Sequence, residues 1–223
     1  MSIVLNYVSR TIRGVEVLQN VSLRMDAGRV TGLEGVNGSG KTMVMRVIAG
    51  LVKPTSGTVE IDGRELGEFM AFPPSIGLLI ENPAFLPSRS GKENLELLAS
   101  INNRIGSEQI EQVIAMVGLD PHDRRPFKKY SLGMKQRLGI AAAIMESPDI
   151  VLLDEPTNAL DSSGVTMVKR VVAAQRARGA TVVLTCHDRE ILYELADEVY
   201  AMAEGRIQSH MILKGAIKDA SHA

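Results

Sequence analysis

The segment Gly35–Thr42, GVNGSGKT, constrains this 223-residue chain more than any other. It has the pattern GxxxxGK[ST], in which glycines let backbone N–H groups close around phosphate oxygens while the lysine and the hydroxyl serve the terminal phosphates and magnesium. A short apolar run ending at Leu33 precedes the segment. Lys41–Leu51 follows it, with apolar positions spread all round and no helix breaker before Gly50. The order of strand, glycine loop and buried helix therefore predicts a phosphate-binding loop.

Two later segments carry further chemistry, Tyr130–Arg137 (YSLGMKQR) and Ile150–Pro156 (IVLLDEP). The apolar residues of the second predict a buried strand with Asp154 and Glu155 at its carboxyl end, near the phosphate loop. Adjacent residues on an extended strand point to opposite sides, so we expect two distinct roles for these acids. The first segment predicts a helix whose N-terminus forms a second anion-binding site.

The remaining pattern predicts an α/β fold. β-Branched and apolar runs separated by Gly and Asp indicate an antiparallel β entry. Further along, alternating strands and helices imply a mainly parallel sheet covered on both faces. The expected entry strands are Ile3–Tyr7, Val15–Met25 and Arg29–Leu33. The later expected elements are strands at Pro54–Asp62, Ile76–Ile80, Ile150–Leu153 and Thr181–Cys186, helices at Ser163–Arg178 and Arg189–Leu195, and two short strands ending at Ile207.

The character of the sequence changes after Asn82. Prolines 83 and 87 precede helical patterns at Gly91–Asn102 and Ser107–Val117, and no strand pattern returns before Asp149. We expect one domain, in which a helical subdomain (82–148) is inserted into an α/β core (1–81 and 149–210). The C-terminal tail at 211–223 shows no pattern of a further domain.

Composition narrows the functional classes. The formal net charge is −1 with no basic run, so we expect no nucleic-acid partner. Cys186 is the single cysteine, which excludes an internal disulfide and suits a reducing compartment. The N-terminus shows no secretory signal, and no segment approaches the roughly 20 consecutive apolar residues that span a bilayer. We therefore expect a cytoplasmic protein without direct membrane insertion.

Together, the three segments resemble the ATP-binding subunit of an ABC transporter, and the resemblance runs from about Ile3 to Gln208. It implies a P-loop NTPase core of the ABC type that binds ATP and Mg²⁺ and hydrolyses ATP. It also implies an ATP-sandwiched dimer, with a second copy or a paralogous ATPase subunit. An integral-membrane permease on another chain would hold the dimer at the inner face of the cell membrane. YSLGMKQRLGIA and IENPAF (Ile80–Phe85) resemble a bacterial subgroup associated with peptide-antibiotic export or immunity.

The resemblance also implies roles for individual residues. Thr42 and Asp154 would hold Mg²⁺, Asp154 through water, and Glu155 would position or activate the attacking water. His187, after the strand TVVLTC, would contact the γ-phosphate together with Lys41. Ser131, Gly133 and Asp161 would reach the nucleotide or the interface of the opposite subunit. The nucleotide-binding residues expected within the phosphate loop are Gly35, Val36, Asn37, Gly38, Ser39, Gly40, Lys41, Thr42 and Met43.

The chain departs from the family pattern at several positions. Glu81 stands where the family has glutamine; its carboxylate could bind Mg²⁺ more tightly, or the change is a tolerated variant. Ile12 stands where many members stack adenine on an aromatic ring, so we expect an apolar contact there. In the signature segment, Tyr130, Leu132 and Met134 replace the family's Leu, Gly and Gln.

Other functions remain open within and beyond the family. An importer, or a lipoprotein-releasing or division-linked ATPase, fits the same motifs. A soluble ABC-like ATPase acting on ribosomes or DNA usually carries tandem domains or a long coiled-coil insertion, and this sequence shows neither. A non-hydrolysing regulatory domain is disfavoured by intact Lys41, Asp154, Glu155 and His187.

Overall fold

The computed structural model describes residues 1–81 and 83–214. Its strands are β1 (Ile3–Ile12), β2 (Val15–Met25), β3 (Val30–Glu34), β4 (Ser56–Ile61), β5 (Arg64–Glu65), β6 (Ile76–Leu79), β7 (Ile150–Leu153), β8 (Thr181–Thr185), β9 (Glu198–Ala203) and β10 (Arg206–Ile212). Its α-helices are α1 (Lys41–Ile48), α2 (Gly91–Asn102), α3 (Ser107–Met116), α4 (Leu132–Ile144), α5 (Ser162–Ala177) and α6 (Arg189–Leu195), and a 3₁₀ turn spans Phe127–Lys129.

The smaller sheet is antiparallel, with strand order β2-β1-β4-β5. The expected entry is correct for its first two strands and wrong for Arg29–Leu33, which forms β3 in the middle of the larger, parallel sheet. β3 is almost fully buried, as a central parallel strand requires, and β4 pairs with β1 in its place.

The first strand of the small sheet runs to Ile12, further than the predicted end at Tyr7. Tyr7 has a φ of 49°, and the register with β2 shifts between Leu5 and Val8. This bulge interrupts the alternation of side chains, so the sequence pattern stops there although the strand continues.

The larger sheet has the order β10-β9-β3-β8-β7-β6, and every pair except β10–β9 is parallel. Every residue of β7 is buried, because both faces of this sheet are covered. Side chains alternate between two apolar cores: Ile150 and Leu152 join one, Val151 and Leu153 the other. The predicted mainly parallel sheet is confirmed.

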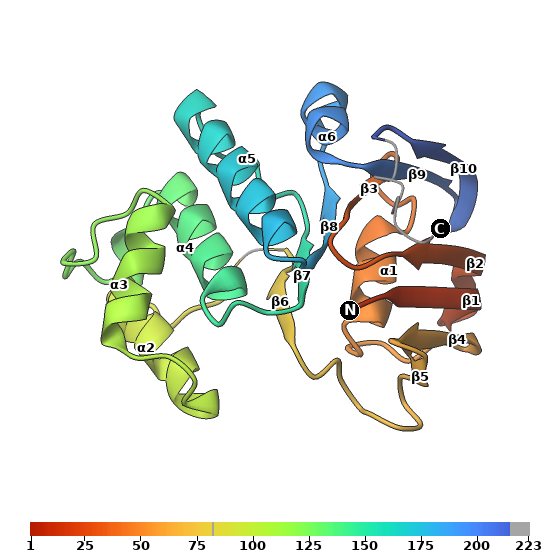
Figure 1. The fold of residues 1–223 in the computed structure, drawn as a ribbon, viewed down its shortest axis with the longest axis horizontal. Helices are drawn as coiled ribbons and strands as arrows, with labels where there is room; N and C mark the ends of the chain where they lie inside the picture. The colour runs from red at the N-terminus through yellow and green to blue at the C-terminus, as the bar shows by residue number, and fades with distance from the viewer. Residues whose placement is uncertain (82, 215–223) are drawn as a thin grey trace, which may run out of the picture.

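The two cores define the layers of the molecule. One contains α1, through residues such as Val44 and Ile48, together with Leu5 of the small sheet and Ile150 of the large one. The other contains residues of α4, α5 and α6 with the opposite face of the large sheet. Figure 1 shows α2, α3 and α4 grouped at one end of the molecule, away from the small sheet. The carboxyl ends of β3, β7 and β8 lead into α1, α5 and α6, respectively. The helix α1 covers one face of the large sheet, and α5 and α6 cover the other.

Local signals place the helices where the sequence predicts them. Ser90 caps α2 by accepting a hydrogen bond from Glu93 N–H at 3.2 Å, while the Glu93 carboxylate accepts from Ser90 N–H at 2.7 Å. This reciprocal pair satisfies two backbone donors at the helix start. The predicted range Gly91–Asn102 matches α2 at both ends.

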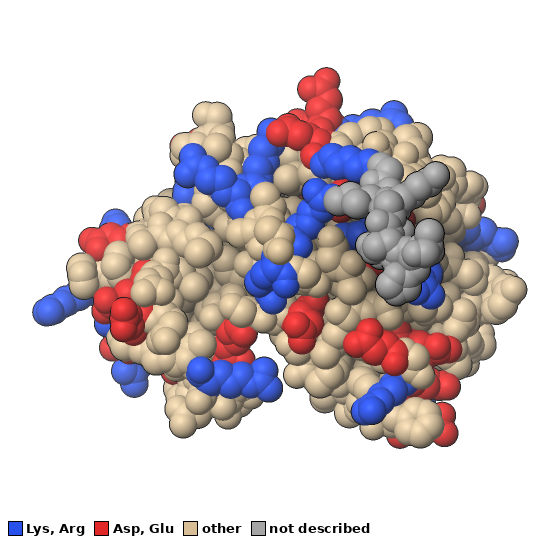
Figure 2. All heavy atoms as spheres, in the orientation of Figure 1, with Lys and Arg blue, Asp and Glu red and all other residues tan. Residues whose placement is uncertain are grey.

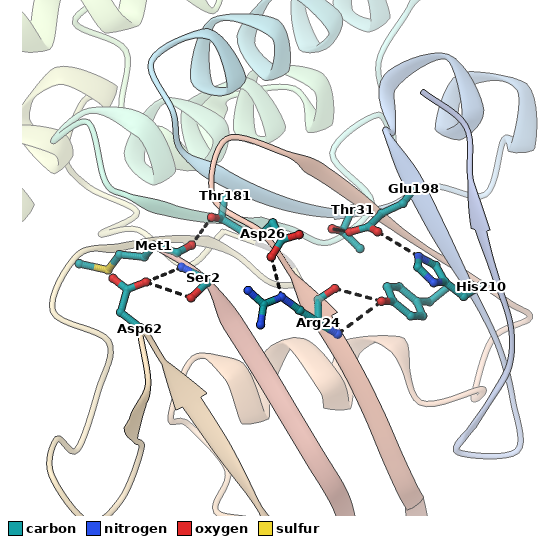
Figure 3. Close-up of polar contacts among 10 residues, drawn as sticks. Met1, Ser2, Arg24, Asp26, Thr31, Asp62, Thr181, Glu198 and His210 are labelled. Carbon is teal, nitrogen blue, oxygen red and sulfur yellow. Dashed lines mark hydrogen bonds and ion pairs between the residues drawn. The ribbon is translucent and has the colours of Figure 1, made fainter. Parts of the chain in front are cut away.

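The end of the chain differs from expectation. β10 continues to Ile212 rather than ending at Ile207, so the predicted tail begins inside a strand, and residues 215–223 lie outside the described part. Contacts between strands explain the extension. His210 on β10 stacks on Tyr200 with ring centroids 4.0 Å apart, and its Nε2 lies 2.9 Å from the buried Glu198 carboxylate. Figure 3 shows Glu198 between His210 and Thr31, whose hydroxyl donates to it at 2.9 Å.

The described residues include no helix long and apolar enough to cross a bilayer. On the face drawn in Figure 2, basic and acidic side chains are interspersed.

Candidate functional site

The glycine loop lies between the carboxyl end of β3 and the start of α1. Gly35, Gly38 and Gly40 have φ values of 153°, 81° and 105°, which L side chains rarely adopt. A Cβ at Gly35 would also lie 2.3 Å from the Met202 carbonyl oxygen and 2.6 Å from Ser39 Oγ. Within the described residues, the buried Ser39 Oγ has no hydrogen-bond partner. The loop therefore forms a tight backbone cradle, in which the Ser39 hydroxyl can still form a hydrogen bond with a ligand.

Lys41 places its ammonium group inside this cradle. The side chain is buried, and Nζ donates to the carbonyl oxygens of Gly35 at 2.7 Å and Val36 at 3.1 Å. A buried ammonium group beside backbone N–H groups at a helix N-terminus favours an anionic ligand. Lys41, which was predicted to contact the terminal phosphates, therefore has its ammonium group within the loop.

Asp154 brings together an α1 residue and a β8 residue. Thr42 Oγ1 donates to its Oδ2 at 2.6 Å, and Thr185 Oγ1 donates to its Oδ1 at 2.7 Å. The predicted metal-binding residues Thr42 and Asp154 are thus direct neighbours. Mg²⁺ commonly takes one or two protein oxygens and completes its octahedron with water and substrate phosphates, so this donor set fits it. Thr185 was missed by the sequence analysis, because nothing marks a polar residue at a strand end as a partner of a distant acid.

Glu155 does not continue the strand. β7 ends at Leu153, and Glu155 has a φ of 51°. The prediction that strand alternation separates the two acids is wrong, because a left-handed turn does so instead. Glu155 N–H donates to Thr185 Oγ1 at 2.8 Å, and its carbonyl oxygen accepts from Gln136 Nε2 at 2.9 Å. The turn is therefore held by β8 and by α4.

The Glu155 carboxylate lies beside His187. Oε2 accepts a hydrogen bond from the His187 backbone N–H at 3.0 Å, and Oε1 lies 3.4 Å from His187 Nε2. Burial raises the pKa of Glu155 and outweighs the opposing effect of His187; Asp154 raises it further and Lys41 lowers it. A partly buried carboxyl with a raised pKa, held beside an imidazole ring, is suited to act as a general base.

A cavity of about 460 Å³ opens above the loop. Asp154 and Glu155 lie on its wall, as does most of the glycine loop from Asn37 to Met43. The remaining lining residues are Val15, Glu16, Val17, Gln19, Glu204 and Gly205. Ile12, the predicted apolar contact for the base, is not among them, whereas the exposed Val15 is. Ile12 ends β1 and Val15 begins β2, and the two residues pair across the turn between these strands. Val15 is the one of this pair that lines the cavity.

The other predicted residues lie away from this cavity. Glu81 has a φ of 59° and forms an ion pair with Arg46 of α1. Ser131 caps α4, accepting from Met134 N–H at 3.2 Å. Asp161 caps α5, accepting from Gly164 N–H at 2.8 Å, and these contacts hold its pKa below the usual range.

Gly133 packs against the loop that follows β7. A Cβ there would lie 3.0 Å from the Ala159 carbonyl oxygen, so the start of α4 and the segment before Asp161 lie against each other. Neither Ser131 nor Gly133 contributes to the lining of the cavity around Lys41. The predicted site is therefore divided in this structure. We call the residues around Lys41, Thr42 and Asp154 the loop half, and Ser131 with Gly133 the signature half.

The residues of the loop half fit a nucleoside triphosphate with Mg²⁺. The positive-φ glycines, the buried Lys41 ammonium and the unsatisfied Ser39 hydroxyl match phosphate oxygens, and Thr42 with Asp154 matches the metal.

Comparison with known proteins gives concordant results. A family model described as ABC transporter matches residues 18–158. An uncharacterized ABC transporter ATP-binding protein of Bacillus subtilis, YybJ, is 43% identical over 91% of this chain and 93% of its own length. The lantibiotic transport ATP-binding protein SrtF of Streptococcus pyogenes is 35% identical over 91% of this chain and 85% of its own. The bacitracin transport ATP-binding protein BcrA of Enterococcus faecalis is 36% identical over 86% and 63%, respectively.

Solved structures show the same fold. A dimeric ATP-binding cassette in a post-hydrolysis state, bound to ADP and Pi, superposes with a TM-score of 0.87 at 25% identity, over 96% of this chain and 99% of the other. An ATP-binding subunit of an ABC transporter superposes with a TM-score of 0.86 at 23% identity, over 96% and 90%.

Proposed function

The chain belongs to the ABC transporter family as an ATP-binding subunit with ATPase activity, and we propose that it powers the export of a peptide antibiotic. The names of two relatives, a bacitracin and a lantibiotic transport ATP-binding protein, support this class of cargo. ABC ATP-binding subunits act with membrane permeases. We therefore place this chain at the inner face of the cell membrane, bound to a permease on another chain.

The observation that carries the hydrolytic part of the proposal is the contact between Glu155 and His187 beside the phosphate loop. His187 N–H holds one carboxylate oxygen, and its ring lies at the other. In the proposed mechanism, Lys41 and the loop N–H groups bind and orient the phosphates, and Thr42 with Asp154 would hold Mg²⁺. The metal, when bound, neutralises charge on the phosphoryl group during transfer. Glu155 orients the attacking water and accepts its proton, while His187 keeps the carboxylate in place.

We infer that the second half of the site comes from a partner subunit. Ser131 is exposed at the N-terminus of α4, where backbone N–H groups favour an anion. Because its segment does not line the cavity around Lys41, it is available to a nucleotide held by another copy or by a paralogous subunit. The dimeric ADP-bound relative supports this arrangement.

We propose that the permease docks between the large sheet and the helices at 82–148, which we treat as a helical subdomain. A cavity of about 430 Å³ lies between β6, the edge strand of the large sheet, and α2 with α4. Leu98 and Ile101 of α2 line this cavity, and their exposed fractions are 37% and 76%, respectively. A neighbouring pocket shares Leu78 and Leu98 with it and reaches Ile80, next to Glu81. Movement of α2 and α4 would therefore be transmitted to Glu81 and the site.

The experiment is expression of the tagged chain with its neighbouring permease gene in an antibiotic-sensitive host. The wild type should co-purify with the permease from membranes and raise resistance to a bacitracin- or lantibiotic-type peptide. Lys41→Ala should retain co-purification but lose resistance. Unaltered resistance with Lys41→Ala would contradict the proposed function.

A further inference from the structure

A cluster of polar side chains connects the strand that enters the phosphate loop to the helix that follows His187. Glu34 is the last residue of β3, immediately before Gly35. Its Oε2 accepts a hydrogen bond from Tyr193 Oη at 2.8 Å, and its Oε1 lies 3.0 Å from Nε of Arg189. Both partners belong to α6. The carboxylate therefore binds two residues of one helix at once.

The two α6 residues also bind each other. Arg189 Nη2 donates to Tyr193 Oη at 2.8 Å, and the guanidinium carbon lies 4.9 Å from the centroid of the Tyr193 ring. The tyrosine hydroxyl thus accepts from Arg189 and donates to Glu34, which uses both of its hydrogen-bonding capacities. We call Glu34, Arg189 and Tyr193 the β3–α6 brace.

The brace acts on the segment that carries His187. Arg189 is the first residue of α6, two positions after His187, and Asp188 caps the helix between them, accepting from Glu190 N–H at 2.9 Å. β3 and β8 pair in register through Leu33 and Thr185, so the phosphate loop and the His187 segment leave the sheet side by side.

Beneath the brace, α6 packs closely against β3. Leu192 is fully buried, and a Cβ at Gly32 of β3 would lie 3.0 Å from its Cδ1. A glycine at this position lets the helix approach the strand closely. The helix α6, which begins two residues after His187, is therefore packed closely on β3.

We propose that Glu34, Arg189 and Tyr193 are positioning residues for ATP hydrolysis, which hold His187 at the distance from Glu155 and the phosphate loop that the reaction needs. The inference rests on the catalytic role proposed above for His187. The Arg189 side chain is 66% exposed, so its ion pair contributes little to folding stability. Its effect is on geometry, and activity and stability should respond differently when the brace is broken.

The first test measures steady-state ATPase activity of Tyr193→Phe and Glu34→Gln. Tyr193→Phe removes one hydroxyl and no charge. The control is Glu194→Gln, which removes an α6 ion pair with Lys169 that faces α5 instead of β3. We expect both brace variants to lower kcat about three- to tenfold, the range typical of coupled neighbours, with an unchanged KM for ATP and an unchanged Tm. The control should match the wild type in all three.

The second test repeats the substitutions in a His187→Ala background. If the brace acts through His187, Tyr193→Phe should lower the residual rate no further. Additive losses would overturn the proposal, as would a wild-type kcat for both brace variants. A normal kcat for His187→Ala alone would instead overturn the catalytic role of His187, so the two failures are distinguishable.

A spectroscopic readout covers the case in which His187→Ala has no measurable rate. The chain has only four histidines, so the imidazole Cε1–H resonance of His187 can be assigned by its loss in His187→Ala. Tyr193→Phe should shift this resonance in the nucleotide-free protein, and Glu194→Gln should leave it in place. An unmoved resonance in Tyr193→Phe would overturn the proposal.

Discussion

Thr42 and Asp154 share a hydrogen bond of 2.6 Å although 112 positions separate them in the chain. The bond joins the first turn of α1 to the residue after β7 and so aligns the phosphate loop with the acid pair. It also places a hydroxyl and a carboxylate where a metal bound to the phosphates would need them. The chemistry of the site therefore depends on how the large sheet orders its strands.

Glu155→Gln should retain ATP binding but slow hydrolysis by at least ~100-fold, within the usual range for losing a general base. The amide keeps the shape of the side chain and cannot accept the proton. ATP should then trap a dimer that gel filtration detects. Glu108→Gln on the exposed face of α3 is the control and should hydrolyse ATP normally. Near-normal turnover of Glu155→Gln would contradict the assignment.

The same variant should be more stable than the wild type at neutral pH. Burial raises the pKa of Glu155 in the folded protein above its unfolded value, so the carboxyl favours folding only while it is protonated. That contribution is complete below the unfolded pKa of about 4.5 and is lost as the pH rises through the folded pKa. The excess Tm of Glu155→Gln should therefore be largest near pH 7 and shrink towards pH 4. A Tm difference independent of pH would show that burial of this carboxylate carries no cost.

Mixing Ser131→Arg with Lys41→Ala should restore ATPase activity that neither variant has alone. Each heterodimer would contain one site with an intact loop from one subunit and an intact α4 N-terminus from the other. The measurement is phosphate release from the mixture, with cross-linking to verify that heterodimers form. Activity no higher than the sum of the separate variants, despite heterodimers, would exclude a site shared between subunits.

In the structure Glu81 pairs with Arg46 outside the cavity, so a role at the metal requires its carboxylate to leave Arg46 when nucleotide binds. If it does so, Glu81→Gln should raise the free Mg²⁺ needed for half-maximal ATPase activity, because the variant removes an anionic oxygen. Affinity for metal-free ATP should be unchanged or improved. Arg46 competes for the same carboxylate, so Arg46→Gln should move the Mg²⁺ curve in the opposite direction. Titration of Mg²⁺ at fixed ATP tests both, and superimposable curves would make Glu81 a neutral variant.

Ile101→Glu should reduce co-purification of the permease while leaving basal ATPase activity unchanged. The side chain is 76% exposed and lines the groove between β6 and α2, so a charge there opposes an apolar partner without disturbing the core. Met116→Glu on α3 provides a control at a site 53% exposed, outside the groove. Equal loss of permease with both variants would indicate a general effect of charge on the helices.

Local sequence signals were sufficient to predict the type and approximate bounds of many helices and strands. The predicted bounds of α2 and β2 match the structure, because a helical pattern marks the first and a run of β-branched and apolar residues marks the second. They were insufficient where a tertiary contact overrides the pattern. β1 continues past the bulge at Tyr7 because it pairs with β2, and β10 extends to Ile212 because His210 packs on Tyr200.

The candidate site divides in the same way. The phosphate loop and the acid pair could be found from short segments whose residue types and spacing indicate their chemistry, and His187 from the family resemblance. Three contacts could be found only from the fold: Thr185 joins Asp154 to Glu155, Val15 rather than Ile12 lines the cavity, and Glu34 contacts α6. These contacts depend on β3 lying between β8 and β9 and on the turns at strand ends. Strand order arises from the packing of the whole sheet, which no single segment encodes.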